Sequence, residues 1–188
     1  MKITPLNIKG AFLLEGELFT DNRGGFRELM KFSELKNIEN LLPWVQNNVS
    51  VSNKNSIRGI HYSLDLHPQH KLISCLNGKI RDFVVDIRQD SPTFGQFLEI
   101  TLNSNEPTSV YIEGGLGHAF IAETENCVVS YLLTAEYNAS KEYAVNPFDT
   151  TININWNVSN YHISEKDSQS PSLNIAKKIG ILPKVLLN

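Results

Sequence analysis

The stretch KLISCLNGKIRDFVVDIR, residues 71–88, decides the fold class. Two runs rich in apolar and β-branched residues, 71–76 and 79–87, flank the pair Asn77-Gly78. Asn-Gly between two such runs is a strong local signal for a β-hairpin with a two-residue turn. The sequence therefore predicts two strands here, joined by a tight hairpin turn.

Short runs of the same kind recur along the chain, separated by turn sequences such as DNRGG, NSNEP and GGLG. The others are GAFLLEGELF (10–19), SIRGIHYSL (56–64), GQFLEITL (95–102), SVYIEG (109–114), HAFIAE (118–123), CVVSYLLTAEY (127–137) and TININW (151–156). About eight short strands with regular turns are typical of a sandwich or barrel of the jelly-roll kind.

Helices are minor elements in this pattern. KFSELKNIENLLP (31–43) predicts a helix that begins after Ser33 as N-cap and ends before Pro43. SLNIAKKIGIL (172–182) is a weaker candidate. We predict an all-β jelly-roll barrel with a few short helices, formed as a single domain by residues 1–188.

The composition favours a protein of the cytoplasm. The net charge of −3 gives no sign of a nucleic-acid-binding surface. No stretch approaches eighteen apolar residues, and the N-terminus MKITPLNIKG lacks the apolar core of a signal peptide. Cys75 and Cys127 both lie in strand-like runs, which favours free thiols in a reducing compartment; a disulfide between them is the alternative. We therefore expect neither nucleic acid nor membrane as a partner.

The stretch RGIHYSLDLHPQHK (58–71) concentrates candidate functional groups: Arg58, three histidines and Lys71. A metal site is disfavoured because His61 is followed by Tyr62 and Ser63, so the His-x-His pair common in small β-barrels is missing. Nucleophilic catalysis lacks a recognisable motif. Proton transfer fits better, since a histidine can remove a proton next to a carbonyl, a lysine can stabilise the enolate oxygen and a tyrosine can return a proton.

Alternation along residues 56–62 leaves one question open. Arg58, Ile60 and Tyr62 share one face of the predicted strand, whereas His61 lies on the other. Gly59 between them is typical of a bulge, which would re-aim its neighbours. Alternation alone does not decide whether Arg58 and His61 reach the same cavity.

Nine collinear pieces then carry a resemblance to a known family. They are FTDNRGGFRE (19–28), VQNNVSVS (45–52), SIRGIHY (56–62), QHKLI (69–73), GKIRDFVVDIRQDSPTFG (78–95), GLGHAF (115–120), YLLTAEY (131–137), INW (154–156) and ISEKD (163–167). In this order and spacing the chain resembles the dTDP-4-dehydrorhamnose 3,5-epimerase family of the cupin superfamily. The stretch from 78 to 95 is the most specific of the nine.

The resemblance implies an isomerase of deoxysugar biosynthesis, as in the making of rhamnose. Its members are cupin barrels, usually homodimers with an exchanged N-terminal strand, and need no metal or other cofactor. They act on a nucleotide-linked 4-keto-6-deoxyhexose, for which dTDP is the expected nucleotide. Epimerisation at C3, C5 or both would proceed by removal of the α-proton, stabilisation of the enolate and return of a proton on the opposite face.

Matched residue by residue, the resemblance also implies roles. His61 would be the base, Asp167 its orienting carboxylate, Lys71 the enolate stabiliser and Tyr131 the proton donor. The substrate-binding residues would be Arg23 and Arg58 at the diphosphate, Phe26 at the base, and Glu28, Gln46, Asn48, His118 and Tyr137 around the rest of the ligand. Asp82 would support His118, and His67, His70 and His162 are expected on the surface. Tyr111 and Tyr143 are expected in packing or at the surface.

The chain departs from the family around the sugar. The unusual residues are Glu113, Leu116, Ala119, Ala139 and the pair Pro147-Phe148. None replaces a proposed catalytic residue, but they put the regiochemistry in doubt. The alternatives are a single-site C3 or C5 epimerase, a 3,4-ketoisomerase, a non-catalytic nucleotide-sugar binding protein and a metal-dependent cupin oxygenase.

Overall fold

The computed structural model describes residues 1–36, 38, 41–65 and 69–185. Its strands are β1 (Lys2–Pro5), β2 (Ala11–Glu15), β3 (Leu18–Asp21), β4 (Gly24–Arg27), β5 (Gln46–Ser52), β6 (Ile57–Ser63), β7 (Lys71–Asn77), β8 (Lys79–Val85), β9 (Phe97–Asn103), β10 (Thr108–Ile112), β11 (Gly117–Ala122), β12 (Cys127–Leu133) and β13 (Glu142–Ala144). Its helices are α1 (Phe32–Leu35), α2 (Glu165–Ser168) and α3 (Leu173–Lys178). The expected all-β fold with a few short helices is confirmed.

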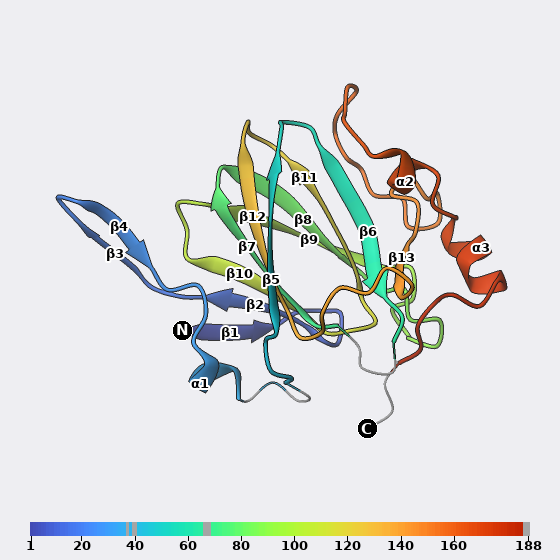
Figure 1. The fold of residues 1–188 in the computed structure, drawn as a ribbon, viewed down its shortest axis with the longest axis horizontal. Coiled ribbons are helices and arrows are strands. Elements are labelled where there is room, and N and C mark those ends of the chain that lie inside the picture. Colours follow the sequence, from blue (N-terminus) through green and yellow to red (C-terminus); the bar gives the residue numbers. More distant parts are fainter. Residues whose placement is uncertain (37, 39–40, 66–68, 186–188) are drawn as a thin grey trace.

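Two antiparallel sheets form the barrel (Figure 1). One has the strand order β1-β2-β10-β7-β12-β5, and the other has the order β13-β6-β11-β8-β9. Strands β3 and β4 pair only with each other, and Figure 1 shows this hairpin projecting away from the two sheets. Crossings between two facing sheets are the mark of a jelly roll.

The predicted hairpin at Asn77-Gly78 is wrong. Strand β7 pairs with β10 and β12, whereas β8 pairs with β9 and β11, so the turn carries the chain from one sheet to the other. Gly78 has a φ of 81°, and a Cβ there would stand 2.3 Å from the Thr124 hydroxyl oxygen. Glycine is therefore required at position 78 by the backbone angle and by close packing. The Asn77-Gly78 pair forms a tight turn, as predicted, but this turn connects two sheets and not two paired strands.

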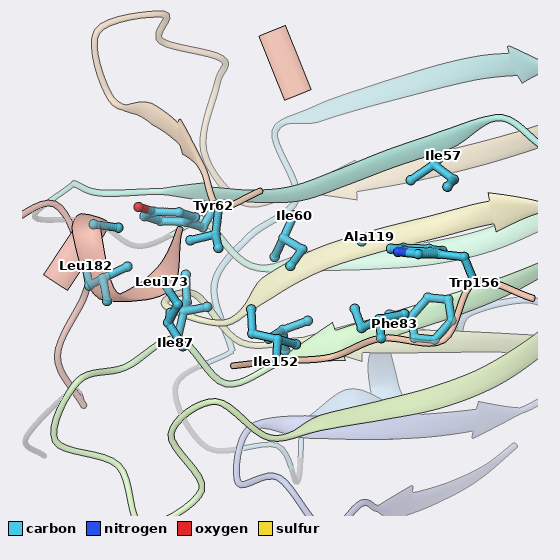
Figure 2. Packing of buried hydrophobic residues seen from close by; sticks show 14 of the residues in the cluster. Ile57, Ile60, Tyr62, Phe83, Ile87, Ala119, Ile152, Trp156, Leu173 and Leu182 are labelled. Atoms are coloured by element: carbon cyan, nitrogen blue, oxygen red, sulfur yellow. The ribbon is translucent and has the colours of Figure 1, made fainter. Parts of the chain in front are cut away.

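Apolar side chains fill three layers, which explains why residues 71–88 read as nearly continuous apolar runs. Between the sheets lie residues such as Ile73, Val84 and Phe120. Outside the second sheet, Phe83 and Ile60 pack under the C-terminal segment with Trp156 and Leu173 (Figure 2). A third cluster covers the outer face of the first sheet and includes Leu14, Leu35, Leu72 and Tyr111.

Some predicted elements differ from the structure. TININW (151–156) was predicted as a strand but is not one. Its alternation nevertheless has a structural meaning, because Ile152, Ile154 and Trp156 pack into the apolar layer outside the second sheet. Asn153 adopts a φ of 58°, which interrupts an extended strand. Strands β1, β4, β5 and β13 were not predicted.

The helices are shorter than predicted. The first begins at Phe32, so Ser33 lies inside it, and Lys31 stands at the N-cap without a side-chain bond. Burial of Leu35 and Ile38 against the first sheet holds this segment in place; residues 37, 39 and 40 of the predicted helix lie outside the described residues. The second predicted helix corresponds to α3, which begins after Ser172 and ends at Lys178; the Ser172 hydroxyl accepts a hydrogen bond from the Ile175 amide. None of the helices among the described residues is long and apolar enough to cross a membrane.

Candidate active site

Period two along the strands brings polar groups into the layer between the sheets. Lys71 lies two residues before Ile73, Asp82 two before Val84, and His118 two before Phe120, so each shares a face with a residue of the inner core. These polar groups gather at one end of that layer beside a pocket. The pocket is lined by Asn48, Val49, Ser50, Arg58, His61, Gln69, Lys71, His118, Phe120, Tyr131, Leu133, Tyr137, Glu142, Tyr143 and Lys166.

His61 and Asp167 form a dyad at this pocket. The His61 Nε2 atom lies 2.7 Å from Asp167 Oδ1. Burial alone would raise the pKa of Asp167, but the hydrogen bond and charge of His61, with bonds from the Gly59 amide and at Ser164, hold it below its usual range. An ionised carboxylate accepts only, so Nε2 carries the proton and Nδ1 of a neutral ring is left free to take one.

The start of α2 fixes the carboxylate. Ser164 is its N-cap, and its side-chain oxygen accepts a hydrogen bond from the Asp167 amide at 3.1 Å. This is the role that serine prefers at a helix start. The Asp167 side chain is buried, while the His61 side chain is 40 % exposed. The dyad therefore joins a fixed carboxylate to an imidazole that is open to a ligand.

A bulge in β6 settles where Arg58 points. The pairing of β6 with β11 matches His118 to His61 and Phe120 to Arg58, so two residues of β6 oppose the single residue Ala119. Gly59 makes this possible, since its φ is 123° and a Cβ there would lie 2.4 Å from the Ala119 Cβ. The bulge shifts the alternation by one, and both Arg58 and His61 line the pocket.

Tyr131 enters the pocket from the other sheet, on β12. Its hydroxyl lies 2.9 Å from the Ser50 hydroxyl on the neighbouring strand β5. Burial raises the pKa of Tyr131 to about 12, although the Ser50 bond and the Arg58 charge oppose the change. The phenol is therefore protonated at neutral pH and can donate a proton.

Lys71 is buried at the first position of β7. Its Nζ donates a hydrogen bond to the His61 carbonyl oxygen at 3.3 Å. Burial lowers the pKa of Lys71, and the nearby Glu142 carboxylate opposes that change. The lysine is thus held beside the dyad as a poorly solvated donor, where its charge acts strongly on a bound oxygen.

Several predicted binding residues surround these groups. The Arg58 Nε donates to the Ser52 hydroxyl at 3.0 Å, and its Nη2 donates to the Val51 carbonyl at 3.3 Å. Asn48 and Tyr137 line the pocket. Gln46 lies behind them, because its Nε2 donates to Asn48 Oδ1 and its Oε1 accepts from the Tyr137 amide, both at 2.8 Å.

His118 and Asp82 form a second, fully buried dyad. Their Nε2 and Oδ1 atoms are 2.6 Å apart, which agrees with the expectation that Asp82 supports His118. The imidazole meets the Tyr131 ring edge-on, with centroids 6.0 Å apart. The predicted residues of β6, β7, β11 and β12 and of α2 are therefore brought together around one pocket.

Three predicted residues lie elsewhere. Arg23, Phe26 and Glu28 belong to the projecting β3–β4 hairpin and its end, and none lines the pocket of its own chain. The Arg23 Nη2 pairs with Asp21 at 2.6 Å, the Phe26 ring is exposed beside Phe19, and Glu28 pairs with Lys31.

Sequence reasoning also missed pocket residues. Ser50 shares a face of β5 with Asn48, and Gln69 shares one with Lys71, so alternation could have found both. Glu142, Tyr143 and Lys166 come from β13 and α2, and no local pattern relates them to β6. Tyr143, expected in packing or at the surface, stacks on Tyr62 and also lines the pocket.

The prediction for His70 is wrong. It is 1 % exposed, and its Nδ1 lies 2.5 Å from the hydroxyl of buried Tyr111. Since Lys71 faces the inner layer, His70 faces outward into the third cluster, which the N-terminal segment covers. His162 is exposed as expected, and His67 lies outside the described residues. Over the described ranges, no three or more His, Cys, Asp or Glu side chains are grouped to hold a metal ion, and Cys75 and Cys127 are free thiols.

The fold and the site define a class: a cupin-type jelly-roll barrel with an acid–base pocket between its two sheets. A family model described as dTDP-4-dehydrorhamnose 3,5-epimerase matches residues 5–174. A dTDP-4-dehydrorhamnose 3,5-epimerase of Streptomyces griseus is 39 % identical over 181 residues, which is 95 % of this chain and 90 % of that protein. The chain belongs to the dTDP-4-dehydrorhamnose 3,5-epimerase family, whose members are isomerases.

Solved structures agree with this assignment. The 4-keto-6-deoxy sugar epimerase NovW of Streptomyces spheroides has a TM-score of 0.95 and 31 % identity, covering 98 % of this chain and 94 % of its own. ChmJ of Streptomyces bikiniensis, a 3'-monoepimerase solved with dTDP-quinovose, has a TM-score of 0.92 and 34 % identity, with 96 % and 92 % covered. The similar proteins thus include epimerases of different regiochemistry.

Proposed function

We propose that this chain epimerises a dTDP-linked 4-keto-6-deoxyhexose at C3, C5 or both. One observation carries the proposal: His61, which is paired with Asp167, and the protonated Tyr131 lie on opposite sheets and line the same pocket. Inversion of a carbon needs a base on one face and an acid on the other. The family and the dTDP-sugar bound to a similar protein support the choice of substrate.

Proton removal is the role proposed for His61. A hydrogen on a carbon next to the C4 ketone is acidic only if the electrons of the broken C–H bond can move onto the carbonyl oxygen. His61 Nδ1 takes the proton, and Asp167 stabilises the resulting imidazolium through its 2.7 Å contact with Nε2. The dyad also fixes the tautomer that leaves Nδ1 as the acceptor.

Lys71 and Tyr131 complete the cycle. The enolate oxygen is stabilised by the Lys71 ammonium group, which lies beside the dyad in a buried setting. Tyr131 then gives its proton to the opposite face of the carbon. The Tyr131 phenolate then takes a new proton from solvent through Ser50, which is hydrogen-bonded to it. The His61 imidazolium releases its proton to solvent, so both groups return to their starting forms.

Substrate binding is proposed for the remaining residues. Arg58 holds the diphosphate, since guanidinium groups bind phosphate oxygens in a planar, two-pronged way. Asn48, His118 and Tyr137 contact the ligand from the pocket wall, and Gln46 positions two of them.

We further propose a homodimer in which each β3–β4 hairpin completes the pocket of the other copy. The hairpin projects from its own barrel, and Phe19 and Phe26 on it are 53 % and 71 % exposed. Arg23, Phe26 and Glu28 do not line the pocket that His61 and Tyr131 share on their own chain. Placed at a second copy, Arg23 would reach the diphosphate and Phe26 the base. We also propose that residues 1–188 act as one domain in the cytoplasm.

Proton NMR in D2O tests the function. The protein is mixed with dTDP-4-keto-6-deoxyglucose, and the C3 and C5 signals are followed. Deuterium at both carbons indicates a 3,5-epimerase, and deuterium at one identifies a single-site epimerase. A 3-keto product would favour a ketoisomerase. Tight dTDP-sugar binding without exchange would favour a binding protein and contradict the proposal.

A further inference from the structure

Gln69 lies in the pocket with an amide oxygen that accepts no hydrogen bond from the described residues. The residue is 6 % exposed and lines the pocket beside Lys71. Its Nε2 donates to the Ala135 carbonyl oxygen at 3.1 Å, which fixes the orientation of the amide. Across the part of the chain that the structure describes, nothing donates a hydrogen bond to its Oε1.

The backbone of His70, the residue after Gln69, is held by two hydrogen bonds to Thr134. The His70 amide donates to the Thr134 hydroxyl at 2.8 Å, and the Thr134 amide donates to the His70 carbonyl at 3.2 Å. Because His70 faces the outer cluster, Gln69 and Lys71 face the inner layer together. Side chains two residues apart on an extended chain lie about 7 Å apart. Gln69 therefore presents an acceptor to the pocket from a position next to that of the Lys71 ammonium group on the same face.

We propose that Gln69 Oε1 accepts a hydrogen bond from the C2 hydroxyl of the sugar, so that the site selects 2-hydroxy over 2-deoxy substrates. The inference rests on the proposed epimerase function. With the C4 oxygen at Lys71, the ring hydroxyls are those at C2 and C3. The C3 hydroxyl changes face when C3 is inverted, whereas the C2 hydroxyl keeps its place. A fixed acceptor serves the hydroxyl that does not move.

The physical basis of the selection is an unpaired acceptor. With a 2-deoxy sugar bound, water is displaced from Gln69 Oε1 and no donor replaces it. A buried polar atom without a partner is costly, and sites that hydrogen-bond a substrate hydroxyl reject analogues that lack it. We expect kcat/KM for the 2-deoxy analogue to be lower by about 10-fold or more.

The experiment compares two substrates and three proteins. Initial rates are measured for dTDP-4-keto-6-deoxyglucose and its 2-deoxy analogue with wild type, Gln69→Leu and Gln89→Leu. Gln89 is the matched control, because its Nε2 also donates to a backbone carbonyl, that of Leu182, but it lies outside the pocket. Wild type and Gln89→Leu should prefer the 2-hydroxy sugar, and Gln69→Leu should lose most of that preference.

Binding of dTDP alone shows whether Gln69 recognises the sugar or only supports the chain at Ala135, to whose carbonyl it donates. A selective contact to the sugar leaves the dTDP affinity of Gln69→Leu unchanged within about twofold. If Gln69→Leu lowered kcat/KM equally for both substrates and also weakened dTDP binding, its role would be purely structural and the inference would be overturned. A wild type that does not discriminate would also overturn it, a result that needs no variant. Should Gln69→Leu fold poorly, Gln69→Met preserves the unbranched shape for the same comparison. Lack of turnover of either sugar by wild type would instead overturn the proposed function.

Discussion

His61 and Tyr131 face one pocket from opposite sheets of the barrel. His61 is on β6 of the β13-β6-β11-β8-β9 sheet, and Tyr131 is on β12 of the other. Each is tied to a partner on its own side, His61 to Asp167 and Tyr131 to Ser50. The two proton-transfer groups therefore face the space in which a ligand would lie from opposite sides. The roles of His61 and Tyr131 can be tested separately by substitutions on each side.

Asp167→Asn should lower kcat by at least about 100-fold. The amide can hold the His61 ring by its oxygen but cannot stabilise the imidazolium, and it can also impose the wrong tautomer. Steady-state kinetics measure the effect. Asp65→Asn, outside the pocket, is the matched control. Wild-type kcat in Asp167→Asn would show that the dyad plays no part.

Tyr131→Phe should separate two rates. Removal of the α-proton by His61 survives, so deuterium still enters the substrate from the His61 side, while delivery to the opposite face is lost. NMR in D2O should therefore show epimerisation slowed far more than exchange. Tyr161→Phe, which alters an exposed tyrosine, should change neither rate. Equal slowing of both rates would contradict the assignment of Tyr131 as the acid.

Mixed dimers test the exchange of hairpins. Arg23→Ala and His61→Asn should each be nearly inactive alone. In a hybrid dimer, the pocket of the Arg23→Ala chain would receive an intact hairpin from the His61→Asn chain. Co-expression with two tags should then restore activity to about a quarter of wild type for random pairing. No recovery would show that Arg23 serves its own chain.

His70 should make stability depend on pH. Burial lowers the pKa of His70 from 6.5 to about 4. Because its folded pKa is depressed, the neutral form is favoured in the fold, so its full contribution is present above pH 6.5 and is lost as the pH falls toward 4. The difference corresponds to about 3 kcal/mol.

Urea unfolding at fixed protein concentration measures this effect. Between pH 6.5 and 4, the free energy of unfolding of His70→Gln should fall less steeply than that of wild type. His162→Gln, at an exposed histidine, should follow wild type. Parallel curves for wild type and His70→Gln would contradict the prediction.

The sequence predicted the jelly-roll class well because the strands keep a period of two. Lys71 and Ile73 lie two residues apart on β7 and share its inner face. The turn at Gly78 was misread because a glycine with positive φ serves a hairpin and a crossing between sheets alike. Which strands pair depends on contacts distant in sequence, and no local signal contains them.

The site, too, was predicted only in part from the sequence. His61 and Asp167 are 106 residues apart, so only the family resemblance joined them. Gly59 indicated a bulge in the sequence. Which side chains the bulge turns toward the pocket depends on the pairing with β11, where Ala119 approaches Gly59 closely. His70 was misplaced because its outward face is covered by the third cluster, and alternation cannot tell a covered outer face from a solvated one.

The most direct test of His61 as the base is proton exchange in D2O with wild type and His61→Asn. Asparagine keeps a polar group near Asp167 but cannot accept a proton at neutral pH. We expect exchange at C3, C5 or both in wild type, and a rate at least about 1,000-fold lower in a folded His61→Asn that still binds dTDP. Exchange at the wild-type rate in His61→Asn would contradict this assignment, because another group would then be removing the proton.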